Sequence, residues 1–136
     1  MEILASRILL RPRDPARTRR FYEQSLGLHV FREFGEGASR GVVYFLGGAY
    51  LELSGAGDEA ATDATQIWLQ VRSVVDVHAA LAAANAPIVE PPELKPWGLV
   101  ELRVRDPDDR LLIFVEVPPD HPMRLDSRRA APERDP

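Results

Sequence analysis

The chain has 136 residues, a net charge of −4 and no cysteine. That length allows one domain with a hydrophobic core, and the charge provides no basic surface for nucleic acid. The lack of cysteine excludes disulfides, thiolate metal sites and a catalytic thiol. Residues 1–10 lack a signal-peptide pattern, and no apolar run is long enough to span a membrane. We therefore expect a soluble, cytoplasmic protein with neither nucleic-acid nor membrane partners.

The first predicted unit is a strand, a helix and three further strands within residues 3–54. An apolar strand at 3–11 precedes Asp14, whose carboxylate suits a helix N-terminus, and a helix is expected over 14–26. Gly27 supplies the left-handed residue that ends this helix. Three β-prone runs then predict strands at 29–34, 42–46 and 50–53.

A second unit of the same kind is predicted within residues 66–117, after a small, polar linker at 55–65. Ser73 suits the start of its helix, and Asn85 suits its end. Its strands are predicted at 67–71, near Ile88, at 99–105 and at 111–117, and prolines make the one near Ile88 short or an edge strand. Residues 1–117 are thus expected to form one domain, followed by an arm of proline and charged residues at 118–136.

The two units are related by an internal repeat of 59 residues. This offset pairs Leu10 with Leu69 and Arg13 with Arg72. It also pairs the predicted helix caps, Asp14 with Ser73. The shared element order, more than the few identities, indicates a duplication.

The order strand-helix-strand-strand-strand, repeated twice, resembles the vicinal oxygen chelate superfamily, which contains glyoxalases, extradiol dioxygenases and bleomycin-resistance proteins. Specific motifs carry the resemblance: Asp14, Phe21-Tyr22, Leu26-Gly27-Leu28, Leu51-Glu52-Leu53 and Asp106-Pro107-Asp108. The resemblance implies an α+β fold in which two βαβββ modules form a curved, cup-like mixed sheet. It also implies a homodimer, an expectation that the unpaired edges of an open cup favour.

The superfamily's enzymes hold one divalent metal at four positions on the inner face of the cup. The resemblance places these positions at Arg7, Glu52, Gln66 and Ile113. Glu52 is an acceptable ligand and Gln66 a weak one, but Arg7 has no lone pair to donate and Ile113 has no donor atom. A guanidinium ~4 Å from a divalent ion would cost roughly 8 kcal/mol at a surface-like dielectric. We therefore expect neither a metal nor another cofactor.

Two alternative sources of a metal ligand or a catalytic base, Glu116 and the histidines, have little support in the sequence. Glu116 lies three residues from Ile113, so strand alternation directs it to the opposite face unless a bulge intervenes. His29, His78 and His121 are the only histidines, and none occupies a ligand position. Each is expected to be a surface residue.

Without a metal, the cup is expected to bind a small molecule. Arg7 is expected to receive an anionic or carbonyl oxygen, with Glu52 orienting it, and a self-satisfied ion pair is the alternative. Gln66 and Trp68 are expected to converge with them. Trp68, Tyr44, Tyr50 and Trp97 offer flat apolar walls, although core packing is favoured for any single aromatic residue among them. Trp97 lies on a proline-bounded loop, which is expected to form a lid or a dimer contact.

Two functions remain open at this point. The first is a metal-free binding protein, similar to the bleomycin-resistance branch, that sequesters an aromatic or antibiotic-like ligand and so confers resistance. The second is a glyoxalase- or dioxygenase-type enzyme with an altered metal site, or with Glu52 as a proton-transfer base. Arg7 together with Ile113 favours the first function. A third possibility is an interaction module that has no small ligand.

Overall fold

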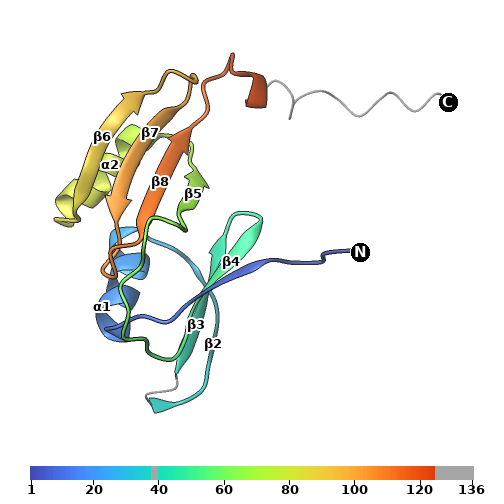
Figure 1. The fold of residues 1–136 in the computed structure, drawn as a ribbon, viewed down its shortest axis with the longest axis vertical. Coiled ribbons are helices and arrows are strands. Elements are labelled where there is room, and N and C mark those ends of the chain that lie inside the picture. Colours follow the sequence, from blue (N-terminus) through green and yellow to red (C-terminus); the bar gives the residue numbers. More distant parts are fainter. Residues whose placement is uncertain (38–39, 125–136) are drawn as a thin grey trace.

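The computed structural model describes residues 1–37 and 40–124. Its first module contains β1 (Arg7–Leu10), α1 (Pro15–Arg20), the π-helix η1 (Phe21–Ser25), β2 (Val30–Phe34), β3 (Gly41–Leu46) and β4 (Ala49–Leu53) (Figure 1). Its second module contains β5 (Ile67–Gln70), α2 (Val74–Ala83), β6 (Ile88–Leu94), β7 (Val100–Arg105) and β8 (Leu111–Glu116). The predicted α+β fold with two βαβββ modules is confirmed.

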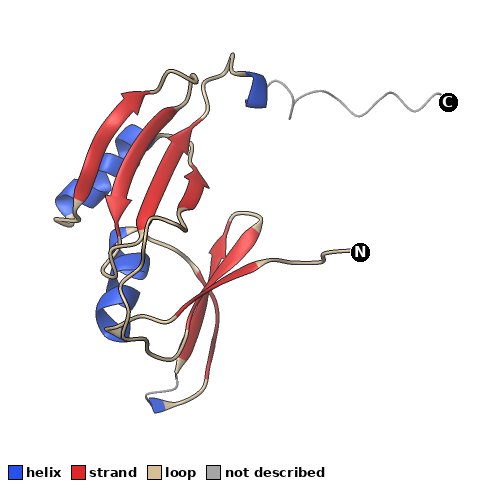
Figure 2. Cartoon of the chain, viewed as in Figure 1, coloured by secondary structure: helices blue, strands red, loops and turns tan. Residues whose placement is uncertain are grey.

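Each module folds into one mixed four-stranded sheet, with the order β1-β4-β3-β2 in the first and β5-β8-β7-β6 in the second. In both, the first and last strands pair in parallel and the other pairs are antiparallel. Within the described residues, no strand of one sheet pairs with a strand of the other. The two sheets follow one another along the long axis of the molecule (Figure 2), so the expected single cup is divided between two sheets.

Strand alternation separates a helix-facing side from an open side in each sheet. Leu10, Tyr44 and Leu51 of the first sheet belong to the same core cluster as Leu102 and Leu112 of the second. The intervening residues of β1 face the other way, and Leu9 is 53% exposed. We call this other side of each sheet its inner face.

Both predicted helix caps are present. The Asp14 carboxylate accepts a hydrogen bond from the Arg17 N–H (3.1 Å), and the Ser73 hydroxyl accepts one from the Asp76 N–H (3.2 Å). Asn85 has the predicted left-handed conformation, with φ 54°.

The single helix predicted over 14–26 instead contains a wider π-turn over η1. The Leu26 N–H donates to the carbonyl of Phe21, five residues back, at 3.0 Å. The consecutive residues Phe21 and Tyr22 are both buried, and their rings meet edge to face. The 3.6-residue periodicity of an α-helix does not predict a π-turn. A π-turn adds one residue to a single helical turn, and that insertion depends on tertiary packing.

The strand near Ile88 lies at the sheet edge as predicted, but it is not short. β6 extends over seven residues and includes Pro91 and Pro92. Its register with β7 shifts twice, between Ile88 and Glu90 and again before Glu93. The missing proline N–H groups are accommodated because an edge strand with irregular pairing needs fewer ladder hydrogen bonds.

The Phe21-Tyr22 and Asp106-Pro107-Asp108 motifs meet at a junction between the modules. The Tyr22 hydroxyl donates to the buried Asp106 carboxylate at 2.6 Å, and the Arg13 Nε donates to Asp108 at 2.9 Å. Asp106 also accepts the N–H groups of Asp108 and Arg110, which shapes the β7–β8 turn. Burial, and then the Asp106 charge, raise the pKa of Tyr22 well above its usual value. These motifs therefore join the modules.

Residues 118–124 continue beyond β8, and the remainder of the predicted arm, 125–136, lies outside the described residues. No helix among the described residues has both the length and the apolar character needed to cross a bilayer.

Candidate functional site

An ion pair occupies the inner face of the first sheet. β1 and β4 run parallel with Leu9 beside Glu52 and Arg7 beside Tyr50, so these four side chains share one face. The Arg7 Nη1 donates to the Glu52 Oε1 at 2.9 Å. The side chain of Glu52 is 11% exposed and that of Arg7 is 36% exposed, so the carboxylate is sheltered while the guanidinium reaches solvent.

Glu52 is held as a carboxylate by several donors. The Ser54 hydroxyl donates to its second oxygen at 2.6 Å, and the Arg11 guanidinium lies 4.0 Å away. The Ser54 hydrogen bond and then the Arg7 interaction lower the pKa of Glu52, against the opposing effect of burial. A carboxyl with a lowered pKa is a weaker base near neutral pH than an unperturbed one.

Three aromatic rings cluster beside this ion pair. Phe31 lies 5.0 Å from Phe45 and 4.8 Å from Tyr50, measured between ring centroids. The Arg7 guanidinium stacks over the Tyr50 ring at 5.8 Å. Phe31 and Phe45 are 44% and 47% exposed, so the cluster offers flat apolar surface to solvent. Sequence reasoning identified Tyr50 but missed Phe31 on β2 and Phe45 on β3. The parity of Phe45, which pairs with Tyr50 in the sheet, was the available signal.

The structure joins Arg7, Glu52 and Tyr50 and places the other predicted site residues elsewhere. Gln66 is exposed, and its amide donates to the Asp63 carbonyl (3.1 Å) in the linker. Trp68, on β5, is 44% exposed and lines a cavity between the modules. Within the described residues, neither Gln66 nor Trp68 has a hydrogen bond or ring contact with Arg7 or Glu52, in contrast to the expected convergence.

Two further aromatic residues differ from the expected walls. Tyr44 is fully buried on the helix-facing side, where its hydroxyl donates to Glu23 (2.9 Å), so it packs in the core, the favoured alternative, and does not line the binding face. Its parity on β3 is opposite to that of Phe45, which explains the difference. Trp97 lies in the β6–β7 loop, is 54% exposed, and donates its indole N–H to Glu101 at 2.6 Å.

Glu101 is a buried carboxylate that sequence reasoning missed. It is 5% exposed, and besides Trp97 it accepts a hydrogen bond from Arg103 at 3.2 Å. The alternation of β7 directs both side chains to the inner face of the second sheet. The acidic residue within the alternating strand β7 was the available signal for this carboxylate. No strand pattern could predict its contact with Trp97, which lies in the β6–β7 loop.

The residues at the four superfamily metal positions do not fit a divalent ion. Glu52 is already bound to Arg7 and Ser54, and the Gln66 amide is engaged with the linker. Ile113 is buried in an apolar cluster with Leu99, Leu111, Val115 and Val117. Glu116, on the regular strand β8, pairs with Val100 and has the opposite parity to Ile113, as predicted. Residues 1–37 and 40–124 also contain no group of three His, Asp or Glu side chains that could hold an ion.

Comparisons with known proteins agree with this fold. Residues 5–114 match the family model of the Glyoxalase/Bleomycin resistance protein/Dioxygenase superfamily. A protein of unknown function from Agrobacterium tumefaciens is 20% identical, with a TM-score of 0.71 and coverage of 87% of this chain and 97% of that one.

Two other solved structures are similar. TioX from Micromonospora sp. is 24% identical (TM-score 0.70, coverage 82% and 97%). A superfamily member from Sphaerobacter thermophilus is 21% identical (TM-score 0.69, coverage 85% and 98%). No curated protein sequence matches the chain. From the family match and the paired βαβββ modules, we conclude that the chain belongs to the glyoxalase/bleomycin resistance protein/dioxygenase superfamily.

Proposed function

We propose that this protein binds a small aromatic anion on the inner face of its first sheet, without a metal ion. The observation that carries the proposal is the Arg7–Glu52 ion pair at a superfamily metal position, beside the exposed rings of Phe31, Phe45 and Tyr50. A guanidinium supplies there the positive charge that a metal supplies in the superfamily's enzymes.

The Arg7 guanidinium has donors available for a ligand. It carries five N–H donors. Within the described part of the chain, Glu52 accepts a hydrogen bond from one of them. Glu52 orients the group, and the stacking on Tyr50 fixes its plane. A carboxylate or carbonyl oxygen of a ligand would bind Arg7, while its rings would lie on the aromatic cluster.

The lowered pKa of Glu52 supports binding over proton-transfer catalysis. A general base is most effective with a pKa near the working pH, whereas Arg7 and Ser54 stabilise the ionised form of this carboxyl. The alternative of an enzyme with an altered metal site requires ligands other than those at the four superfamily positions.

The experiment is a calorimetric titration of the full chain with 2-naphthoate and, separately, with neutral 2-naphthalenemethanol. We expect saturable binding of the anion, and at least tenfold weaker binding of the alcohol. Equal affinity for the two probes would contradict the role of Arg7. Elemental analysis of the purified protein completes the test, since stoichiometric Fe, Mn, Ni or Zn would contradict the metal-free proposal. A screen of bleomycin and other aromatic antibiotics against the same protein tests the resistance function.

We also propose that the protein is a homodimer. β1 and β2 are the edges of the first sheet and β5 and β6 those of the second, and exposed edges favour association. Light scattering at micromolar concentration should give twice the chain mass, and a monomeric mass would contradict the proposal.

A further inference from the structure

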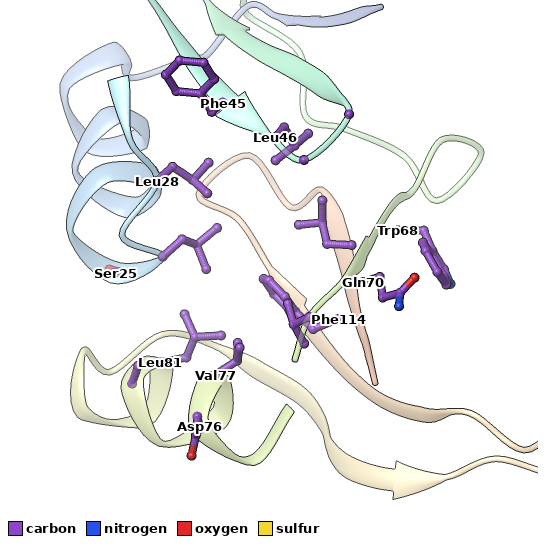
Figure 3. Close-up of a pocket in the computed structure, with 16 residues that line it drawn as sticks. Ser25, Leu28, Phe45, Leu46, Trp68, Gln70, Asp76, Val77, Leu81 and Phe114 are labelled. Atoms are coloured by element: carbon purple, nitrogen blue, oxygen red, sulfur yellow. The ribbon is translucent and has the colours of Figure 1, made fainter. Parts of the chain in front are cut away.

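A cavity of about 570 Å³ lies between the two modules, beside β5, and neither Arg7 nor Glu52 lines it. Figure 3 shows Leu28 and Leu46 of the first module on one side, Val77 and Leu81 of α2 on the other, and Phe114 between them. Its volume is in the range of small-molecule sites, and such sites are mostly apolar.

The internal repeat explains why this cavity exists. The offset of 59 residues that relates the helix caps also pairs Tyr22 with Leu81 and Phe21 with Ala80. By strand order, the β7–β8 turn with Asp106 corresponds to the β3–β4 turn at Gly47-Gly48. The large side chains of one junction are therefore replaced at the other by smaller ones.

The two junctions differ accordingly in contacts. At the first, the buried Tyr22 is hydrogen-bonded to Asp106, and the pocket that remains beside Phe21 and Asp106 is smaller, about 400 Å³, and is lined by several charged residues. At the second, Ala80, Leu81 and the Gly47-Gly48 turn all line the cavity, and an added Cβ at either glycine would meet no heavy atom within 4 Å. The hollow is the space that the first junction uses for its tyrosine–aspartate contact.

The charge of the lining selects the ligand class. Among the residues that the structure describes, Asp76 is the one charged residue that lines the cavity, and Ser25 and Gln70 supply neutral polar groups. An anion would therefore meet a carboxylate without a compensating cation from the lining. We propose that this cavity is a second small-molecule site, which takes a neutral or cationic, largely apolar molecule.

The size and walls of the cavity favour a small molecule over a polypeptide. One wall belongs to each module, and the modules are held together by Tyr22–Asp106 and Arg13–Asp108, so the space is formed before any ligand arrives. Phe45 is shared with the aromatic cluster of the first sheet and Trp68 lies at the edge, so binding should be visible in tryptophan fluorescence.

The test is a titration of the full chain with the neutral dye N-phenyl-1-naphthylamine, whose fluorescence rises in an apolar site. The blocking variant is Ala80→Phe, which restores the residue found at the equivalent position of the first helix. The matched control is Ala79→Phe on the same helix, because Ala79 is exposed like Ala80 but does not line the cavity. We expect saturable binding by the native protein and by Ala79→Phe, and at least tenfold weaker binding by Ala80→Phe.

Two further variants keep the result interpretable. Ala80→Leu adds less volume than Ala80→Phe and should weaken dye binding to an intermediate degree. It replaces Ala80→Phe in the test if circular dichroism shows that Ala80→Phe does not fold. Arg7→Ala should leave dye binding unchanged, which separates this site from the proposed anion site. Equal binding by Ala80→Phe and Ala79→Phe, loss of binding in Arg7→Ala, or absence of saturable binding by the native protein would each overturn the proposal.

Discussion

The two βαβββ modules share a scaffold but differ on their inner faces. In the first sheet, the inner face carries an ion pair and exposed aromatic rings, with Glu52 on β4. In the second, the equivalent strand β8 carries Ile113 within a buried apolar cluster, and the carboxylate Glu101 lies on β7 instead. The same strand order and helix caps therefore tolerate different chemistry on the side that the helices do not cover.

The junctions show the same divergence. One is closed around the buried hydrogen bond from Tyr22 to Asp106, with a smaller, charged pocket beside it, and the other is left with a larger, mostly apolar cavity by Ala80 and a glycine turn. The Tyr22–Asp106 junction fixes the relative position of the two modules. Residues at the other junction can then be substituted at a lower cost in stability, because no buried polar contact is lost there.

The largest expected effect comes from the closed junction. Asp106→Ala should lower the free energy of unfolding by about 3 kcal/mol or more, because the Tyr22 hydroxyl and two backbone N–H groups lose their acceptor. Gly48→Ala in the β3–β4 turn should change it by under about 0.5 kcal/mol, since the added Cβ meets open space. Urea denaturation measures both, and similar effects of the two substitutions would break the distinction between the junctions.

The next effect sharpens the contrast between the inner faces. Arg7→Ala should weaken binding of 2-naphthoate at least tenfold, which is about 1.4 kcal/mol. Arg103→Ala is the matched control, because Arg103 is paired with Glu101 on the inner face of the second sheet. Calorimetry with each variant distinguishes them. Equal losses of affinity would place the anion site across both sheets instead.

The helix caps should show where the modules remain alike. Asp14→Ala and Ser73→Ala should each cost about 1 kcal/mol of stability, because each removes an acceptor for an N–H of the first helical turn. The two effects should add in the double variant, since the caps share no partner. Thermal and urea unfolding provide the measurement. If one substitution leaves stability unchanged, the capping hydrogen bond does not stabilise that helix, and the two modules differ there.

The smallest expected effect is the acid dependence of the first inner face. Because the pKa of Glu52 is lowered from its usual 4.5 in the folded protein, its stabilising contribution is present above that pH. The contribution is lost as pH falls through the folded-state pKa. Glu52→Gln should therefore lessen the acid-induced loss of stability, by under about 1 kcal/mol because Arg7 is partly exposed. Unfolding curves between pH 3 and pH 7 test this, and identical profiles would contradict it.

Much of the fold was predictable from local signals. Asp14, Ser73 and Asn85 mark helix ends through hydrogen bonds and backbone conformations that involve only nearby residues. The superfamily resemblance implied that Arg7 and Glu52 lie together, and strand alternation placed Glu116 opposite to Ile113. Applied to β3, the same rule directs Tyr44 to the core and Phe45 to the opposite side.

The site was less predictable because its members come from separate strands and loops. Phe31 reaches Phe45 and Tyr50 across a register shift in β2, and Trp97 reaches Glu101 from a loop. The π-turn at Phe21 and the length of β6 also depend on packing, which overrides local preference.

The sequence by itself determined the duplicated element order and the helix caps, because each depends on periodicity or on hydrogen bonds between near residues. The pairing of Arg7 with Glu52 was implied by the superfamily resemblance. Only the tertiary structure decided how the modules meet, with Tyr22 closing one junction and a cavity left at the other. The physical reason is that packing between distant segments depends on the volumes of side chains that no local pattern brings together.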